Sequence, residues 1–433
     1  MNFHPLLCSL AHRNFRLYFS GQGISLIGTW MQQVAMSWLV YQMTKSSLQL
    51  SVVLFGNQIP ALFLSPVAGA LVDRWNRHRM LLLTQTLAMV QALVLALLTW
   101  TGRIDVWQLL LLSLFLGIVN TFDMTTRQAF LSEMVTRPAD LGNAIALNSM
   151  MVHVARLLGP MLAGILLAQT SAEVCFLLNG LSYLAVLLAL RAMRLEGPRR
   201  ERSTPLWQGL REGFRYVSSF APIRTLLLLL ALASMAGTSY TVLLPELTVR
   251  QLDGDAQTLA FLMAAAGLGA LTGALFLASR KSVLGLERWI LLALTLLGGS
   301  LLTLAVVADF LLALLVLFLI GLGIMVELAA SNTLLQTIAA EDKRGRVMSF
   351  YTMAFLGMAP LGSLLTGMLA TWLGLPLTCL INGLLCLAGA ALFGFSLPHL
   401  CVLVRPIYVR LNLLPPLTSG IATASELETV TKE

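Results

Sequence analysis

The stretch Gly69-Ala-Leu-Val-Asp-Arg-Trp-Asn-Arg-His-Arg79 lies between two long apolar segments and carries the most informative charges in the chain. Its polar part begins with Asp73 and Arg74. Short basic loops of this kind mark the cytoplasmic side of a membrane protein. The stretch therefore predicts a chain that crosses a membrane repeatedly, and it fixes the orientation of the other segments.

The composition supports a membrane protein. Hydrophobic residues make up 58% of the 433 residues and charged residues 11%, whereas soluble domains have about half and about a quarter. Because about 20 apolar residues cross the hydrocarbon core, we predict an all-α fold of twelve transmembrane helices. They are expected at 14–41, 47–71, 80–101, 106–130, 142–168, 174–192, 223–246, 256–279, 287–308, 310–337, 347–373 and 375–397.

Positive charges indicate which side of the membrane each loop faces. The loops on the outer side hold only Lys45, Arg103 and Arg250 of the 28 Lys and Arg residues. This asymmetry predicts that both termini are cytoplasmic in a bacterial inner membrane. The net charge of +8 then reflects topology and anionic lipid headgroups rather than nucleic acid.

Two further features exclude other classes of protein. The amino terminus lacks a short apolar core followed by a small-residue cleavage site, so the first apolar span is expected to be a retained helix. The five cysteines have no C-x-x-C spacing, so neither a disulfide framework nor a metal site is expected.

An internal repeat divides the chain. Gly164 aligns with Gly367 at a shift of 203 residues, and at the same shift Asn179-Gly180 aligns with Asn382-Gly383. Parallel repeats of this kind occur in secondary transporters, whose substrate site lies between the halves near the midplane. We expect a first half, a cytoplasmic linker with an amphipathic helix, a second half and a cytoplasmic tail, at 1–192, 193–222, 223–397 and 398–433.

The stretch from Gly69 to Arg79 resembles the loop signature of the major facilitator superfamily, although Asn76 stands where glycine is usual. Other strings resemble one branch, the drug and siderophore exporters that include enterobactin exporters and macrolide efflux proteins. These are Asn14-Phe-Arg-Leu-Tyr-Phe, Gly28-Thr-Trp-Met, Arg127-Gln-Ala-Phe-Leu, Arg156-Leu-Leu-Gly-Pro160, Glu212-Gly-Phe-Arg-Tyr216 and Arg344-Gly-Arg-Val-Met-Ser349.

The resemblance implies gating residues. In the family, the loop aspartate lies near the start of helix eleven and the loop arginine meets an acid on helix four, which would hold the cytoplasmic ends together. We call this contact the cytoplasmic latch. The residues implied in gating are Gly69, Asp73, Arg74, Arg77, Asp123 and Arg127, with Asp123 as the expected partner of Arg77.

Helix five carries a second motif. Gly159, Pro160 and Gly164 resemble an exporter motif, in which small residues let another helix approach closely. Ordinary small-residue packing is the alternative interpretation.

Four charged residues lie well inside the predicted spans rather than near their ends: Asp123, Arg127, Arg156 and Glu327. Charges there are costly and usually face a cavity or a partner. Asp123 and Arg127 are four residues apart, close enough for an ion pair, and they either hold the latch or exchange protons and substrate. Glu327 occupies the repeat-related place of Asp123, and it either carries protons or pairs with Arg156 or another polar group.

Several polar residues are candidates for substrate binding. Arg156 either binds an anionic group or is neutralised by a carboxylate on a neighbouring helix. Polar stripes within spans should face the bundle interior, and the resemblance implies that helices one, four, seven and ten line the cavity. The substrate-binding candidates are Gln22, Ser25, Thr29, Gln33, Arg156, Thr238, Tyr240 and Glu327. Relatives often carry aspartate at the place of Thr29.

These observations predict a secondary exporter of an amphipathic small molecule that works by alternating access in exchange for protons. A siderophore exporter and a lipid or lysophospholipid transporter are the alternatives within transport. A membrane-embedded enzyme or a passive channel is the alternative from another class, but no HExxH, GxSxG or phosphate-cradling loop supports catalysis. We expect a monomer with no cofactor, metal or nucleic-acid partner, working with its substrate, protons and the bilayer.

Overall fold

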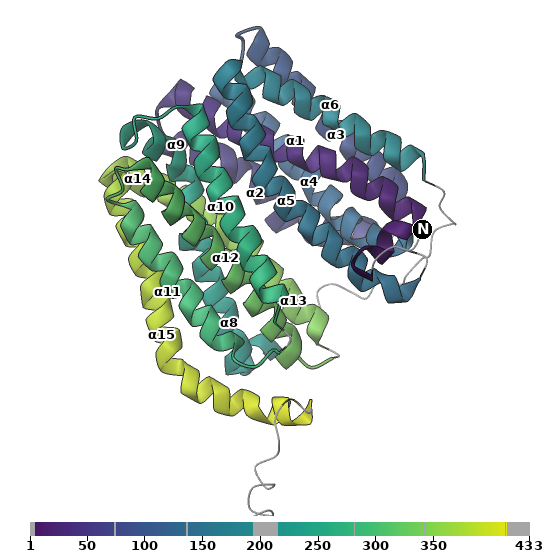
Figure 1. The fold of residues 1–433 in the computed structure, drawn as a ribbon, viewed down its shortest axis with the longest axis vertical. Helices are drawn as coiled ribbons and strands as arrows, with labels where there is room; N and C mark the ends of the chain where they lie inside the picture. The colour runs from purple at the N-terminus through teal and green to yellow at the C-terminus, as the bar shows by residue number, and fades with distance from the viewer. Residues whose placement is uncertain are drawn as a thin grey trace, which may run out of the picture.

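The computed structural model describes residues 5–72, 75–135, 137–193, 215–280, 282–341, 343–411 and 413. Every regular element in these ranges is a helix, and the helices form two bundles set at an angle to each other (Figure 1). The all-α fold that the apolar spans predict is therefore confirmed.

The first bundle contains six long helices, which begin and end close to the predicted spans. They are α1 (Arg13–Thr44), α2 (Ser47–Val72), α3 (Arg77–Trp100), α4 (Val106–Met134), α5 (Leu141–Gln169) and α6 (Ala172–Arg191). Two short 3-10 helices, η1 (Pro5–Ala11) and η2 (Pro138–Asp140), lie at its cytoplasmic end. His12 after η1 bonds to Asp140 of η2 at 2.8 Å.

The second bundle repeats this order, but two of its spans are interrupted. Span seven consists of α8 (Ala221–Leu232), the π-helical turn η3 (Ala233–Gly237) and α9 (Tyr240–Arg250). Span eleven consists of α13 (Arg344–Thr352), the π-helical turn η4 (Met353–Gly357) and α14 (Met358–Leu373). The remaining helices are α10 (Ala256–Ala278), α11 (Leu286–Leu304), α12 (Phe310–Ile338) and α15 (Leu375–Arg410).

Helix length supports twelve crossings, and composition supports eleven of them. Eleven helical spans of the described chain are long and apolar enough to cross a membrane. The 32 residues of α1 exceed the roughly 20 that a crossing needs, and α1 runs within the first bundle against α5 and α6. Asp105, Asp255 and Asp309 accept backbone N–H bonds at the outer starts of α4, α10 and α12, which satisfies donors that helix starts leave open.

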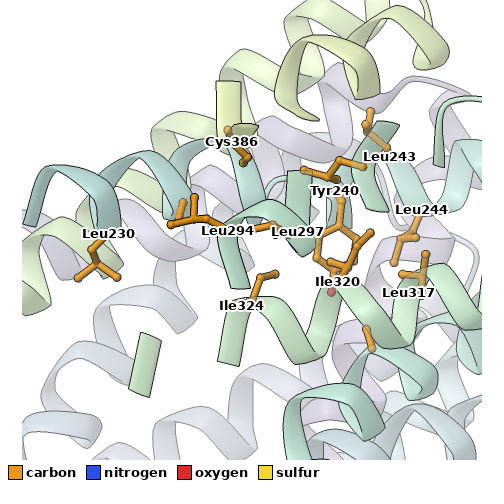
Figure 2. Close-up of a cluster of buried hydrophobic side chains, with 14 of the residues drawn as sticks. Leu230, Tyr240, Leu243, Leu244, Leu294, Leu297, Leu317, Ile320, Ile324 and Cys386 are labelled. Carbon is orange, nitrogen blue, oxygen red and sulfur yellow. The ribbon is translucent and has the colours of Figure 1, made fainter. Parts of the chain in front are cut away.

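The halves make their most extensive contacts through two helix pairs, α5 with α10 and α2 with α14. Small residues allow this contact, because a side chain at Gly164 would meet Ala260 and one at Gly367 would meet Ser51. The second half has its own core, in which leucine and isoleucine side chains of α11 and α12 pack around Tyr240 (Figure 2). Close helix crossing at small residues, rather than burial from water, is the expected packing mode within a bilayer.

The last helix and the linker differ from the other predicted segments. The last helix does not end at 397, since α15 continues to Arg410 through Pro398 and Pro406. Most of the linker at 193–222 lies outside the described residues, as does the tail beyond 413.

Candidate functional site

Arg156 is a cation at the boundary between the two halves, about halfway along α5. The guanidinium of Arg156, on α5, lies 5.2 Å from the ring centroid of Trp30 on α1, within range of a cation–π interaction. Tyr240 of the second half interacts electrostatically with Arg156. A side chain at Gly267 on α10 would lie 2.8 Å from the backbone carbonyl of Arg156. Both halves therefore contribute to the surroundings of this arginine.

The carboxylate partner expected for Arg156 is not found. No acidic side chain in the described ranges lies within ion-pair distance of it, so neutralisation by a neighbouring helix, including pairing with Glu327, is wrong. One turn before it, the Nδ1 atom of His153 is buried without a hydrogen-bond partner among the described residues. The group of Arg156, Trp30, Tyr240 and His153 is called the central cation site below.

The polar stripe of α1 does not line this site as a whole. The Thr29 hydroxyl contacts the backbone oxygen of Ser25 at 3.0 Å and the Tyr183 hydroxyl of α6 at 3.5 Å. Gln32 accepts a hydrogen bond from Asn179 of α6 at 2.7 Å. This part of the stripe therefore lies inside the first half, because α1 presents its small and polar residues to α6.

The other substrate-binding candidates are also mostly enclosed. Gln22 and Ser25 are buried, while Gln33 and Thr238 are half-buried. Thr238 donates to the backbone oxygen of Ser234 at 2.6 Å. Tyr240 is 2% exposed, with its ring pointing into the core cluster of the second half (Figure 2). Its interaction with Arg156 connects it to the boundary between the halves.

Asp123 and Arg127 form the ion pair that their spacing on α4 predicts. Asp123 is buried and also accepts hydrogen bonds from Thr84 at 3.0 Å and from Gln85 at 2.7 Å, both on α3. Arg127 interacts with Tyr18 on α1. The pair thus connects three helices of the first half and lies away from the central cation site.

The expected contact between Arg77 and Asp123 is wrong. Arg77 donates instead to Glu133, near the end of α4, at 2.8 Å, and to the backbone oxygen of Ala129 at 3.4 Å. Arg77 is the first residue of α3, at the cytoplasmic end. Glu133 lies near that end of α4, whereas Asp123 lies about three turns deeper, so Arg77 pairs with Glu133. Asp73 and Arg74 lie outside the described residues, and the cytoplasmic latch stays a prediction.

Glu327 has few polar contacts. It is 2% exposed on α12, and its only hydrogen bond among the described residues comes from Ser331 at 3.1 Å. No lysine, arginine or histidine in the described ranges forms an ion pair with it. Tyr351 of α13 and Cys386 of α15 lie near it. Glu327 is therefore enclosed in the second half, apart from Arg156.

The two glycines of the helix-five motif face different partners. A side chain at Gly159 would overlap Trp30 and the backbone oxygen of Ile27, so Gly159 serves packing with α1 inside the first half. Gly164 faces Ala260 of α10 across the boundary. Pro160 is buried between them. By contrast, a side chain at Gly69 would meet nothing within 4 Å.

Sequence reasoning missed one cluster at the outer end of the boundary. Ser47, the first residue of α2, donates a hydrogen bond to Glu246 of α9, and both side chains are buried. Glu246 also pairs with Arg250 at 3.0 Å. We call Ser47, Glu246 and Arg250 the outer lock. The signal available was the acidic residue at the end of a predicted span with an arginine four residues later.

Comparison with known proteins places this architecture in a family. The family model described as "Transmembrane secretion effector" matches residues 5–402. The chain belongs to this family of the major facilitator superfamily. It is a transporter of the bacterial inner membrane, as the loop signature and the charge asymmetry predict.

Relatives of known name cover nearly the whole chain. The chain is 25% identical to a staphyloferrin A transporter of Staphylococcus aureus, over 88% of this chain and 95% of the relative. It is 27% identical to the multidrug efflux pump Tap of Mycobacterium tuberculosis, over 90% and 94%. It is 29% identical to an enterobactin exporter of Escherichia coli O1:K1, over 93% of each.

Solved structures share the fold. A POT family transporter in complex with 5-aminolevulinic acid matches with a TM-score of 0.72 at 11% identity, covering 90% of this chain and 96% of the other. A bacterial homologue of the lysosomal transporter Spinster matches with a TM-score of 0.69 at 15% identity, covering 92% and 98%.

Proposed function

We propose that this transporter exports an amphipathic small molecule that carries an anionic group, by alternating access and in exchange for protons. The observation that carries the proposal is Arg156. It is a cation at the boundary of the two halves whose surroundings are aromatic rather than acidic. A charge held within the membrane without a counter-charge favours binding of an oppositely charged ligand.

The aromatic surroundings match the rest of such a molecule. Trp30 offers a flat apolar face beside the guanidinium, and aromatic faces bind rings and alkyl groups without requiring one geometry. A carboxylate or catecholate on the ligand would bind the guanidinium of Arg156, while the ligand's apolar part would contact the indole of Trp30.

Two of the relatives favour one class of substrate. Their names assign them to staphyloferrin A and to enterobactin. A siderophore is therefore our second, narrower candidate. The multidrug efflux pump among the relatives supports the broader one.

Proton exchange would rest on Glu327. A carboxyl group enclosed without a cation can hold a proton in one access state and release it to water in the other. The repeat-related position is Asp123, which is already paired with Arg127. The two halves would thus have different roles, with the exchangeable proton in the second half.

The test begins with cells that have or lack the protein. An untargeted comparison of retained metabolites, repeated with the proton gradient collapsed, should identify an anionic amphiphile that accumulates only without export. Purified protein in proteoliposomes should then move that compound when a pH gradient is imposed. Flux that ignores the gradient and equilibrates the compound would indicate a passive channel instead.

A further inference from the structure

A pocket lies at the cytoplasmic end of the second half, remote from the central cation site. Its cavity volume is about 290 Å³, near the lower limit of ligand pockets. The walls come from the starts of α8 and α11, the end of α12 and the last part of α15. Pro222, Leu284 and Ile338 line it, each close to a helix end.

The last part of α15 forms the outer wall. In Figure 1 the end of α15 turns and runs across the lower end of the second half. One face of this segment, with Leu400, Val404 and Tyr408, is buried against the bundle. Val402 and Arg405 are exposed and border the same pocket.

The apolar walls alone select nothing. Lipid tails are as apolar as leucine, so an acyl chain gains little by leaving the bilayer for this pocket. Any selectivity must therefore come from the polar groups in the wall, which are few.

Two of these groups carry opposite charges. The Oε2 atom of Glu287 is buried without a hydrogen-bond partner among the described residues, and Oε1 lies 4.0 Å from Sγ of Cys401. Arg405 lines the same pocket. No ion pair joins Glu287 to Arg405 or to another described base. A buried carboxylate oxygen without a donor is costly, and a ligand ammonium would satisfy it.

We propose that this pocket binds a membrane phospholipid with an ethanolamine headgroup. The ammonium donates to Glu287, the phosphate accepts from Arg405, and an acyl chain lies along the apolar wall. A zwitterion matches the pair of charges, whereas an anionic lipid would place no donor against Glu287. The site is independent of the proposed export function, since it shares no residue with the central cation site.

The first test measures which lipid the purified full chain retains. Protein in detergent is equilibrated with equal amounts of phosphatidylethanolamine and phosphatidylglycerol, and bound lipid is counted by native mass spectrometry. Wild type should retain phosphatidylethanolamine in preference, and Glu287→Gln should reduce that preference roughly tenfold, the effect of one charge-assisted hydrogen bond. Arg410→Gln is the matched control, because Arg410 is an exposed arginine of α15 outside the pocket.

Equal retention of both lipids by wild type, or an unchanged preference in Glu287→Gln, would overturn the proposal. A preference for phosphatidylglycerol would also overturn it and would assign the site to an anionic lipid. Thermal unfolding of each variant establishes that it is folded before its lipids are counted.

A second measurement uses Cys401 as a reporter. It lines the pocket and is the exposed cysteine of the five, while Cys175, Cys379 and Cys386 are buried. In a Cys8→Ser background, added phosphatidylethanolamine should slow alkylation of Cys401 by N-ethylmaleimide, and phosphatidylglycerol should not. Protection that needs no lipid and disappears when residues 414–433 are removed would assign the pocket to the chain's own tail instead.

Discussion

Ser47 of α2 donates a hydrogen bond to Glu246 of α9, so that one buried side chain from each half meets its counterpart at the outer end of the boundary. The adjacent contacts are equally close. A side chain at Gly367 on α14 would overlap Ser51, one turn along α2 from Ser47. Opening the transporter to the outside requires this contact to break, and its strength therefore sets part of the balance between access states.

Ser47→Ala should shift the transporter toward the outward-open state. The lost bond to a carboxylate is worth about 1.5–3 kcal/mol, which changes the ratio of states by roughly tenfold or more. Spin labels at Met43 and Asp253, one on each half, measure the shift. The fraction of molecules with a long distance between the labels should increase. Ser46→Ala is the control, since the Ser46 hydroxyl accepts a hydrogen bond from the backbone N–H of Gln49 at the start of α2 and makes no described bond to the second half. An unchanged distance distribution in Ser47→Ala would show that the outer lock does not limit opening.

Glu327→Gln, which mimics the protonated acid, should abolish export driven by a pH gradient while keeping substrate binding and exchange. Flux in proteoliposomes with and without the gradient separates the two activities. Glu341→Gln is the control, because Glu341 is an exposed acid just beyond the same helix. Undiminished coupled flux in Glu327→Gln would move the coupling role elsewhere, first to Asp123.

Arg127→Leu should destabilise the first half, because it leaves the buried carboxylate of Asp123 without its cation. Breaking one partner of a buried pair costs about 3–5 kcal/mol. Thermal unfolding should show a large drop for this variant and a smaller one for the double variant Asp123→Asn with Arg127→Leu. If the double variant lost as much stability as the two single variants together, the two side chains would act independently.

Arg156→Leu should keep the fold but weaken binding of anionic substrates at least tenfold, since it removes a charge that no described acid requires. Arg156→Lys should recover part of the affinity through its charge, though not the planar contact with Trp30. Binding titrations with an anionic and a neutral compound test this. Equal losses for both compounds would indicate a packing role for the arginine.

Asp140 provides a prediction about pH. Its hydrogen bond with His12 lowers the pKa of the Asp140 carboxyl below the ordinary 3.8. Because the folded-state pKa is the lower one, the contribution to stability is full above about pH 3.8 and is lost as the pH falls further. The difference in thermal stability between wild type and Asp140→Asn should therefore shrink as the pH falls below about 3.8. A difference that grows in that range would have the wrong sign.

The sequence predicts the helices well and their contacts poorly. Runs of about 20 apolar residues have one stable form in a bilayer, so α10 and α12 begin within a residue of the spans expected. Rotation of a helix about its axis is not encoded in its own residues. Thr29 and Gln32 share a polar face, but that face is turned to α6 by Tyr183 and Asn179, more than a hundred residues later.

For the site residues, contacts within one helix could be predicted and contacts between helices could not. The pair of Asp123 and Arg127 could be predicted because four residues along one helix fix their distance. The contact between Ser47 and Glu246 spans 199 positions and joins two halves, so only the packed structure brings it together. Arg156 could be recognised as a costly charge, whereas its aromatic partner depends on how closely Gly159 lets α1 approach.

The π-helical turns η3 and η4 give the two halves different mechanics. Each places one extra residue in a helical turn, and such π turns often occur at functional sites within helices. The two turns contact each other, so the cytoplasmic segments α8 and α13 can tilt together about a shared joint. The outer lock lies beyond that joint on α9. Tilting at these turns would open the cytoplasmic side while the bond between Ser47 and Glu246 stays formed.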